Sequence, residues 1–297
     1  MSHCLNPSCY QVNQINAIFC HSCGSPLLLL ERYRGLGVIG QGGFGKTYLA
    51  QDEARPSKPK CVIKQFIYSG EGIEKANQLF QQEAVQLDQL GKHPQIPELF
   101  AHGSRDAQQF LVQEYIDGQN LKQELESQGI FNQTKIRELL LDLLPVLDFL
   151  HKHQVIHRDI KPENIIRRRS DQKLVLVDFG AAKQATQTLL GKTGTMIGSP
   201  EYTAPEQARG KPVFASDIYS LSVTCLNLLT LCSSFDLQNG DGEWVWRDFL
   251  NGNKVSKELR DILDRSLCTL KTLCLSRCYV GSVKSYGDSE SSNNIYS

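Results

Sequence analysis

One short stretch of the chain, HRDIKPEN, runs from His157 to Asn164 and gathers unlike polar groups. It places the carboxylate of Asp159, the ammonium group of Lys161 and the amide of Asn164 close together, while the residues on either side are apolar. A site that handles phosphate groups and metal ions needs such side chains, whereas a solvated loop can be as polar by chance. The other patterns in the chain decide between these two interpretations.

The overall composition is that of an ordinary globular protein. The 297-residue chain balances 32 Lys and Arg against 32 Asp and Glu, which removes the usual electrostatic basis for binding nucleic acid or a membrane surface. The nearly apolar run Leu221–Cys232 better suits a buried helix than a membrane span, and the N-terminus lacks a secretory pattern. We therefore expect a cytoplasmic protein without a membrane segment or a nucleic-acid partner, in which cysteines are thiols or metal ligands rather than disulfides.

The first thirty residues contain no Asp, Glu, Lys or Arg, but they hold four cysteines. Cys4 and Cys9 form a C-x4-C pair, ten residues follow, and Cys20 and Cys23 form a C-x2-C pair. This spacing predicts a tetrahedral Cys4 zinc site whose metal supplies the folding energy that so short a segment lacks. Four protein ligands leave no open position, so the role would be structural. The alternative is a set of free or redox-active thiols.

A glycine-rich pattern, VIGQGGFGKTYLA, follows at residues 38–50. Gly40, Gly42 and Gly45 give G-x-G-x-x-G, in which glycines let backbone N–H groups approach phosphate. In a dinucleotide-binding fold this pattern would run into a helix. Here residues 46–52 (KTYLAQD) continue as an alternating strand, which predicts a strand–turn–strand hairpin that covers phosphates instead.

Two charged residues stand at positions where apolar ones are expected. The strand predicted at Lys60–Phe66 places Lys64 on one face with Val62 and Phe66. The helical pattern that follows carries Glu83 inside its apolar stripe, which consists of Leu79, Leu87 and Leu90. A buried carboxylate is costly unless it is paired, so we predict an ion pair between Lys64 and Glu83. The alternatives are an edge-strand lysine and a half-buried stripe.

Two more motifs close the series. The predicted strand at residues 173–177 ends on Asp178-Phe179-Gly180, which puts a carboxylate at the rim of a sheet. A turn-rich segment, GSPEYTAPEQ, then contains Ala204-Pro205-Glu206. Residues 242–250 (GEWVWRDFL) and 255–267 (VSKELRDILDRSL) are expected to form later helices.

In this order the glycine-rich hairpin, strand lysine, helix glutamate, H-R-D-x-x-x-x-N, D-F-G and A-P-E resemble the eukaryotic-like (Hanks-type) protein kinase family over residues 36–220. The four-cysteine segment resembles that of a bacterial subgroup. The resemblance implies an α+β, bilobal fold. Its parts would be a zinc ribbon at 1–30, a small antiparallel β lobe with one helix at about 31–112, a mainly helical lobe at about 117–270, and an atypical tail at 271–297.

The resemblance also implies an activity, the transfer of the ATP γ-phosphoryl group to Ser or Thr of protein substrates with Mg²⁺, or Mn²⁺ in its place. Asp159 would accept or orient the proton of the substrate hydroxyl, and Lys161 would steady the phosphoryl group. Asn164 and Asp178 would hold the Mg²⁺ ions. Lysine two positions after the aspartate goes with Ser/Thr substrates in this family.

For the nucleotide, the resemblance implies that Lys64 grips the α and β phosphates while Glu83 aims it. Gln113 would lie at the back of the adenine pocket, where many family members have an apolar residue. The further residues implied in ATP binding are Ile39, Gly40, Gln41, Gly42, Gly43, Phe44, Gly45, Lys46, Thr47, Val62, Glu114, Ile116 and Ile166.

Regulation is implied by Arg158, which in the family marks kinases switched on by phosphorylation of the loop after D-F-G. Thr195 is the first candidate acceptor, with Thr193 and Thr188 as alternatives, and autophosphorylation is expected there. Ser199 would contact the catalytic Asp and Lys. The alternative is that these are ordinary loop residues.

The match weakens toward the C-terminus. Asp217 corresponds to the aspartate that supports the catalytic loop, but Ser222 stands where the family usually has glycine. Beyond about Leu267 the likeness fails, and Arg277 is the candidate partner for Glu206 of A-P-E. Two rival functions remain open, a pseudokinase without turnover and a small-molecule kinase on the same fold, although the GSPEYTAPE segment favours a peptide platform.

Overall fold

The computed structural model describes residues 1–42, 45–67, 73–105, 108–179 and 200–268. These residues belong to two compact units, one reaching to Ile116 and the other beginning at Asp117. The expected tail at 271–297 and the loop that contains Thr188, Thr193, Thr195 and Ser199 lie outside the described residues.

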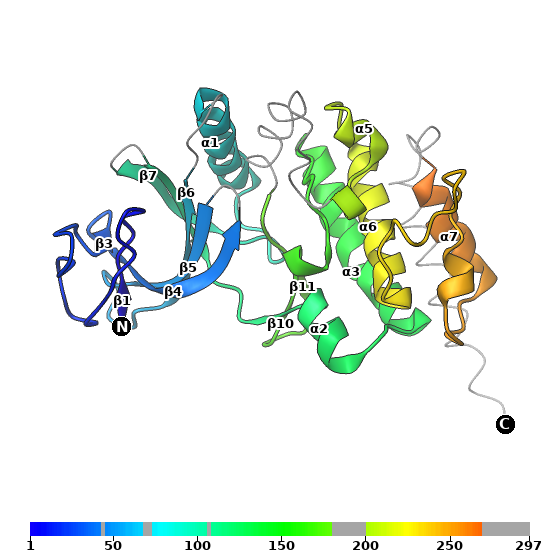
Figure 1. Cartoon of the computed structure of the whole chain (residues 1–297), viewed down its shortest axis with the longest axis horizontal. Helices are drawn as coiled ribbons and strands as arrows, with labels where there is room; N and C mark the ends of the chain where they lie inside the picture. The colour runs from blue at the N-terminus through cyan, green and yellow to red at the C-terminus, as the bar shows by residue number, and fades with distance from the viewer. Residues whose placement is uncertain (43–44, 68–72, 106–107, 180–199, 269–297) are drawn as a thin grey trace. The chain divides into compact units, whose positions relative to one another are not determined.

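The first unit is built on a six-stranded antiparallel sheet with the strand order β3-β4-β5-β6-β8-β7 (Figure 1). Alternation of side chains along the strands gives the sheet two apolar faces. One face buries a cluster that includes Tyr48, Ile63 and Val112. The strands are β3 (Leu28–Leu29), β4 (Tyr33–Gly42), β5 (Gly45–Asp52), β6 (Lys60–Phe66), β7 (Leu99–Arg105) and β8 (Gln108–Glu114).

Helix α1 (Ile73–Leu90) packs on the other face of this sheet. Its buried stripe contains Phe80, Leu87 and Leu90, which follows the predicted helical period; the side chain of Leu79 lies outside the described ones. Phe80 stacks on Phe66 of β6 with ring centroids 5.2 Å apart. The strands and the helix therefore position the two charged residues, Lys64 and Glu83, on facing surfaces.

The N-terminal segment adds a small two-stranded sheet to the first unit. Strands β1 (Ser2–His3) and β2 (Val12–Asn13) pair with each other, and β3 joins the larger sheet by pairing with β4. Leu5 is buried in the same cluster as the side chains of the six-stranded sheet. The four-cysteine segment and the sheet thus share one hydrophobic core.

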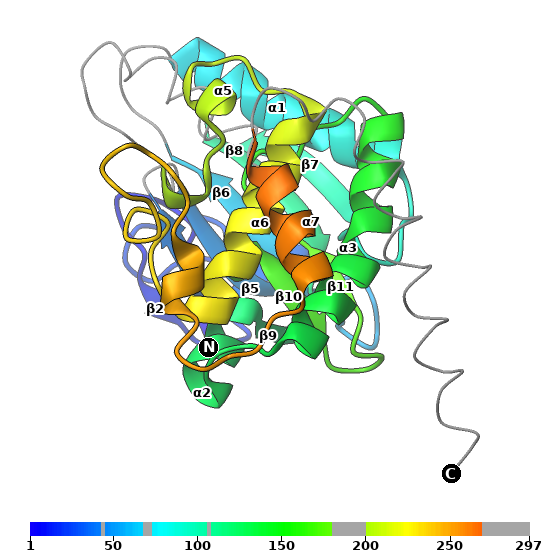
Figure 2. The same cartoon turned by 90° about the vertical axis from the view of Figure 1, so that its right-hand side faces the viewer.

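The second unit is mainly helical and carries a three-stranded sheet with the order β11-β10-β9. Helix α6 packs against both α3 and α7 (Figure 2), and most of its side chains are buried, as its apolar sequence predicts. The longer elements are β9 (Gly118–Asn120), α2 (Leu121–Gln128), α3 (Gln133–Lys152), β10 (Ile165–Arg168), β11 (Leu174–Leu176), α5 (Pro205–Ala208), α6 (Phe214–Thr230) and α7 (Lys257–Leu267).

Local sequence explains where these helices begin. Asn132 caps α3 by accepting a hydrogen bond from the N–H of Lys135, and Ser256 caps α7 through Leu259. The region expected to form a helix before α7 is instead a single 3-10 turn, η3 (Trp246–Phe249). The indole of Trp246 is fully buried and donates to Asp264 of α7 at 3.0 Å, so tertiary packing of one large side chain replaces helical propensity there.

No helix among the residues that the structure describes combines the length and the apolar character needed to cross a bilayer.

Ser222, which stands where the family usually has glycine, is buried in α6. Its hydroxyl donates to the carbonyl oxygen of Ile218 at 3.0 Å, which satisfies the buried hydroxyl within the helix itself.

Candidate active site

In the second unit, the HRDIKPEN segment brings its polar groups together. The Asn164 amide, 5% exposed, donates to the Asp159 carboxylate at 2.6 Å and to the Asp159 carbonyl at 2.8 Å. The Lys161 ammonium lies 3.7 Å from the other carboxylate oxygen of Asp159. Pro162–Asn164 forms a 3-10 turn, and this turn folds Asn164 back onto Asp159.

Asp217 supports the HRDIKPEN segment through hydrogen bonds. Its carboxylate is 1% exposed and accepts hydrogen bonds from the backbone N–H groups of His157 and Arg158, both at 2.9 Å. It also lies 2.9 Å from Nε2 of His151 on α3. Arg158 has a φ of 70°, a left-handed conformation that costs about 1–2 kcal/mol for a residue with a side chain. The charged acceptor offsets this cost, so the resemblance-based assignment of Asp217 as the support of the loop agrees with its contacts.

Asp178 is tied to the same segment through the strand before it. The N–H of Val177 donates to the carbonyl oxygen of Asn164 at 2.9 Å, and Asp178 follows with a φ of 69°. The next residue, Phe179, is buried, and the centroid of its ring lies 4.7 Å from the centroid of the His157 ring. One backbone hydrogen bond and one buried aromatic contact therefore hold the residues on either side of Asp178 to this segment.

In the first unit, the predicted ion pair between Lys64 and Glu83 is confirmed. The Lys64 ammonium donates to the Glu83 carboxylate at 2.9 Å. The Glu83 side chain is 4% exposed and that of Lys64 is 13% exposed, so the two charges are largely removed from water. Neither alternative, an edge-strand lysine or a half-buried stripe, fits this burial.

The glycine-rich segment forms the predicted hairpin. Strands β4 and β5 pair antiparallel up to Gly42 and Gly45, while Gly43 and Phe44 lie outside the described residues. A Cβ at Gly45 would lie 1.9 Å from the carbonyl oxygen of Gln65, so only glycine lets β5 approach β6 there. Thr47 pairs directly with Lys64 across these strands, which joins the hairpin to the lysine.

The remaining residues expected to contact ATP are distributed over both units. Ile39 is 53% exposed on β4, Gln113 is buried on β8, and Ile116 is buried at the end of the first unit. Val62 pairs with Gln113, and Ile166 lies on β10 of the second unit. The expected contacts of these residues with one nucleotide therefore stay a prediction.

The four cysteines of the N-terminal segment cluster as predicted. Their sulfur atoms all lie within 4.8 Å of one another, with 3.6 Å between those of Cys4 and Cys23 and 3.7 Å between those of Cys9 and Cys20. A tetrahedral zinc site with Zn–S bonds of about 2.3 Å requires sulfurs about 3.8 Å apart. The donor set therefore fits zinc.

Neighbouring amides and hydroxyls support thiolate ligands in this cluster. Asn13 directs its amide toward the Cys20 sulfur at 3.6 Å, and Asn6 directs its amide toward the Cys23 sulfur at 3.7 Å. Hydrogen bonding to Ser25 lowers the pKa of the Cys23 thiol to about 6. His21 instead contacts Asn13 through its ring nitrogen at 2.7 Å.

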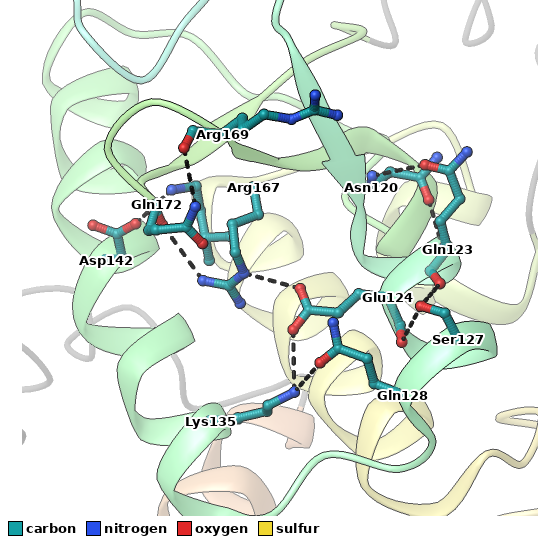
Figure 3. Close-up of polar contacts among 11 residues, drawn as sticks. Asn120, Gln123, Glu124, Ser127, Gln128, Lys135, Asp142, Arg167, Arg169 and Gln172 are labelled. Atoms are coloured by element: carbon teal, nitrogen blue, oxygen red, sulfur yellow. Dashed lines mark hydrogen bonds and ion pairs between the residues drawn. The ribbon is translucent and has the colours of Figure 1, made fainter.

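A separate hollow of about 570 Å³ lies between α2, α3 and the β10–β11 turn (Figure 3). Its central carboxylate, Glu124, pairs with Arg167 at 2.9 Å and with Lys135 at 3.2 Å. None of the HRDIKPEN residues lines it. Its central charged groups, Glu124, Lys135 and Arg167, are engaged with one another, so it is not a candidate for the catalytic site.

Comparison with known proteins agrees with the motifs and the geometry. Residues 33–276 match the family described as the protein kinase domain. Serine/threonine-protein kinases B and F of Synechocystis are both 41% identical to this chain, over 90% and 89% of it and 49% and 59% of their own lengths. Serine/threonine-protein kinase PknA of Nostoc is 40% identical over 81% of this chain and 44% of its own length.

Among solved structures, one described as "PpkA-294 apo form" has a TM-score of 0.66 and 25% identity, covering 80% of this chain and 90% of its own. The chain therefore belongs to the protein kinase family. Within that family its motifs and its similarity to bacterial serine/threonine kinases place it among the Hanks-type members, and the α+β kinase fold predicted from the sequence is confirmed. The chain spans about half the length of the curated relatives it matches.

Sequence reasoning missed one contact at the A-P-E glutamate. Glu206 was expected to pair with Arg277, which lies outside the described residues. Within the described residues, the Ser216 hydroxyl donates to the Glu206 carboxylate at 2.5 Å and accepts from the N–H of Val213 at 3.1 Å. The second Glu206 oxygen is buried and has no hydrogen-bond partner among those residues. A lone serine at the start of a helix gave no signal of this role.

We expect Ser216→Ala to lower the free energy of unfolding by about 1–3 kcal/mol, because a buried acceptor and a helix-start N–H both lose their partner. Chemical unfolding of the purified variant measures this change. Ser220→Ala is the matched control, since Ser220 is also buried on α6 but its hydroxyl donates to the helix carbonyl of Ser216. Equal losses for the two variants would contradict the role of Ser216.

Proposed function

We propose that this chain transfers the γ-phosphoryl group of ATP to serine or threonine hydroxyls of protein substrates. The observation that carries the proposal is the grouping of Asp159, Lys161 and Asn164 within hydrogen-bond or ion-pair distance, on a segment fixed by the buried Asp217. The family to which the chain belongs and its similarity to bacterial serine/threonine-protein kinases support the same activity.

In this proposal Asp159 accepts or orients the proton of the substrate hydroxyl, and Lys161 stabilises charge on the transferred phosphoryl group. Asn164 donates its amide N–H to Asp159, which turns its amide oxygen away from Asp159 and makes it available to a cation. The carboxylate of Asp178 supplies the harder oxygen ligand. Asn164 and Asp178 would thus hold Mg²⁺, or Mn²⁺ in its place, which neutralises charge on the phosphates when it is bound.

ATP would be bound by the glycine-rich hairpin, by Lys64 and by the apolar residues expected around adenine. The Glu83 carboxylate fixes the Lys64 ammonium at 2.9 Å, so the lysine is already oriented before a phosphate arrives. Backbone N–H groups of the hairpin would contact the phosphates. Backbone groups of Glu114 and Ile116 would contact the adenine edge.

The environment of Arg158 supports the proposal that the loop after D-F-G is phosphorylated to regulate the protein. Thr195 is the first candidate acceptor. The Nε atom of Arg158 is buried and has no hydrogen-bond partner among the described residues, and burial lowers the pKa of this guanidinium. A buried cation with an unmet donor is costly, and a phosphate group would supply both charge and acceptors. Autophosphorylation is the simplest source of that phosphate.

The direct test is transfer of a radiolabelled γ-phosphoryl group from ATP to a general protein substrate and to the chain itself. Acid hydrolysis of the product, followed by separation of the phosphoamino acids, is expected to give phosphoserine and phosphothreonine. No transfer by the intact protein would favour the pseudokinase reading, and transfer to aminoglycosides or choline but not to protein would favour a small-molecule kinase. A cytoplasmic setting with protein substrates remains our expectation.

We also propose that the four-cysteine cluster binds a structural zinc ion. Protein purified under reducing conditions is expected to contain one zinc ion per chain by elemental mass spectrometry, because four thiolates complete a tetrahedral site. Cys9→Ser should reduce the zinc content well below one. Cys232→Ser, at a half-buried thiol outside the cluster, should leave it unchanged. Zinc-free wild-type protein, or equal zinc in both variants, would show the cluster to be a set of thiols instead.

A further inference from the structure

The four-cysteine segment covers the face of the six-stranded sheet opposite α1 (Figure 1). Leu5, 1% exposed, packs in a cluster with Tyr48 and Ile63. A Cβ at Gly35 of β4 would lie 3.2 Å from a methyl group of Leu5, so the glycine permits this close approach. The segment is therefore packed onto the sheet that carries the glycine-rich hairpin.

Polar contacts extend from this packing to the strands beside Lys64. Gln65 is the next residue after Lys64 on β6, and its side chain points to the opposite face. Its amide donates to the carbonyl oxygen of Leu5 at 2.6 Å, and its amide oxygen accepts from the Tyr48 hydroxyl at 3.1 Å. The backbone of the segment is thus hydrogen-bonded to a residue adjacent to the lysine of the ion pair.

Tyr10 makes the contact that reaches the hairpin itself. It follows Cys9 directly, adopts a left-handed φ of 54° and packs its ring against the same cluster. The ammonium of Lys46 lies 3.2 Å from the centroid of the Tyr10 ring, a distance at which a cation is attracted to an aromatic face.

Lys46 connects the Tyr10 ring to the backbone of the glycine-rich hairpin. It directly follows Gly45 in the hairpin and pairs with Gln41 on β4 and Gln65 on β6. Because side chains alternate along β5, Lys46 points to the same face as Tyr48, while Thr47 points to the opposite face. The contact between Tyr10 and the Lys46 side chain therefore restrains the backbone of the hairpin. It does so from the face of the sheet opposite to the one that bears Lys64.

We propose that Tyr10 is a positioning residue for ATP, which holds the glycine-rich hairpin through Lys46 and makes the four-cysteine segment part of the nucleotide site. This inference rests on the proposed function, in which the hairpin covers the ATP phosphates. Ordering the hairpin in advance lowers the entropy that ATP binding must otherwise overcome. Because Tyr10 contacts no reacting atom, its contribution should appear in the affinity for ATP and not in the chemical step.

The position of Tyr10 also depends on the cysteines. Leu5 and Tyr10 both pack on the sheet cluster, and each directly follows a cysteine of the sulfur cluster, Cys4 and Cys9. A change at those sulfurs therefore moves the backbone from which both side chains project. This short covalent connection is the physical reason why a distant segment could set the geometry of the hairpin.

Tyr10→Ala is expected to raise the KM for ATP and the dissociation constant of a fluorescent ATP analogue about two- to fivefold, which is the fold-change expected from one partly exposed cation–π contact. The kcat should change less than twofold. Tyr10→Phe keeps the aromatic face and should resemble wild type. Ile18→Ala is the matched control, because Ile18 belongs to the same segment but is 63% exposed.

A double-mutant cycle with Lys46→Met isolates the contact. If the proposal holds, Tyr10→Ala adds no further loss of nucleotide affinity once Lys46 is replaced. Additive effects, or a Tyr10→Ala variant that behaves like Ile18→Ala, would overturn it. Should Tyr10→Ala lose its zinc or fail to fold, Tyr10→Leu against Tyr10→Phe makes the same comparison, since leucine keeps apolar packing without an aromatic face.

Binding of the analogue and phosphoryl transfer are measured separately in these experiments. Wild-type protein that binds the analogue without transferring phosphate would contradict the proposed activity but leave the Tyr10 comparison decisive. Wild-type protein that transfers phosphate, with Tyr10 variants that bind ATP normally, would contradict the role of Tyr10 alone.

Discussion

Asp159→Asn is expected to lower kcat for phosphoryl transfer by roughly 10²- to 10⁴-fold, the range expected when a general base is removed. Asparagine has nearly the same shape as aspartate but cannot accept the proton of the substrate hydroxyl. Its amide can keep an oxygen toward Asn164, which in the wild-type protein donates to Asp159 at 2.6 Å. The segment should therefore stay folded, and binding of a fluorescent ATP analogue should change little.

The comparison needs a variant that makes the same chemical change elsewhere. Asp241→Asn serves this purpose, because Asp241 is exposed and lies far along the chain from the HRDIKPEN segment. Radiolabel transfer by this control should equal that of wild type. If Asp159→Asn kept more than about a tenth of the wild-type rate, Asp159 would not be the base, since loss of a general base costs about 10²-fold or more.

Lys64→Met is expected to act on activity and stability together. Removing a charged group that stabilises the phosphates should lower kcat/KM by roughly 10²- to 10³-fold. The Glu83 carboxylate, 4% exposed, would also lose its ammonium partner at 2.9 Å. Breaking a buried ion pair from one side destabilises a protein by about 3–5 kcal/mol, so the unfolding midpoint should fall markedly in chemical denaturation.

The double variant Lys64→Met with Glu83→Met separates these two effects. Replacing both partners of a buried pair by apolar residues of similar size is often neutral for stability, so most of the lost stability should return. Activity should not return, because no ammonium group is restored. If activity recovered together with stability, Lys64 would be a structural residue, and the proposed grip on the ATP phosphates would be wrong.

Local patterns in the sequence were enough for much of the fold and for the central residues. The period of two on β6 and the helical period on α1 placed Lys64 and Glu83 on buried faces, and the cost of burying one charge alone predicted the ion pair that the structure contains. The glycine spacing followed by an alternating strand predicted the β4–β5 hairpin. Asp159 and Asn164 are five residues apart, so a single 3-10 turn was sufficient to bring them together.

Short spacing also predicted the sulfur cluster, because two cysteine pairs separated by ten residues can reach one point only by folding around it. Contacts between elements that carry no misplaced charge or cysteine pattern could not be predicted from the sequence. Nothing local indicated that Ser216 would bind Glu206, or that Trp246 would replace a helix by a 3-10 turn through its contact with Asp264. Each of these depends on how separate elements pack against one another.

The sequence by itself therefore determined the class of protein and its candidate chemistry, because those reside in residue types at fixed short spacings. Only the tertiary structure decided that the four-cysteine segment shares a core with the sheet that carries the glycine-rich hairpin. The same packing places Tyr10 against Lys46. Tyr10 and Lys46 meet through packing of an uncharged segment onto one face of a sheet. No periodicity along the chain encodes which residues of two such surfaces come into contact.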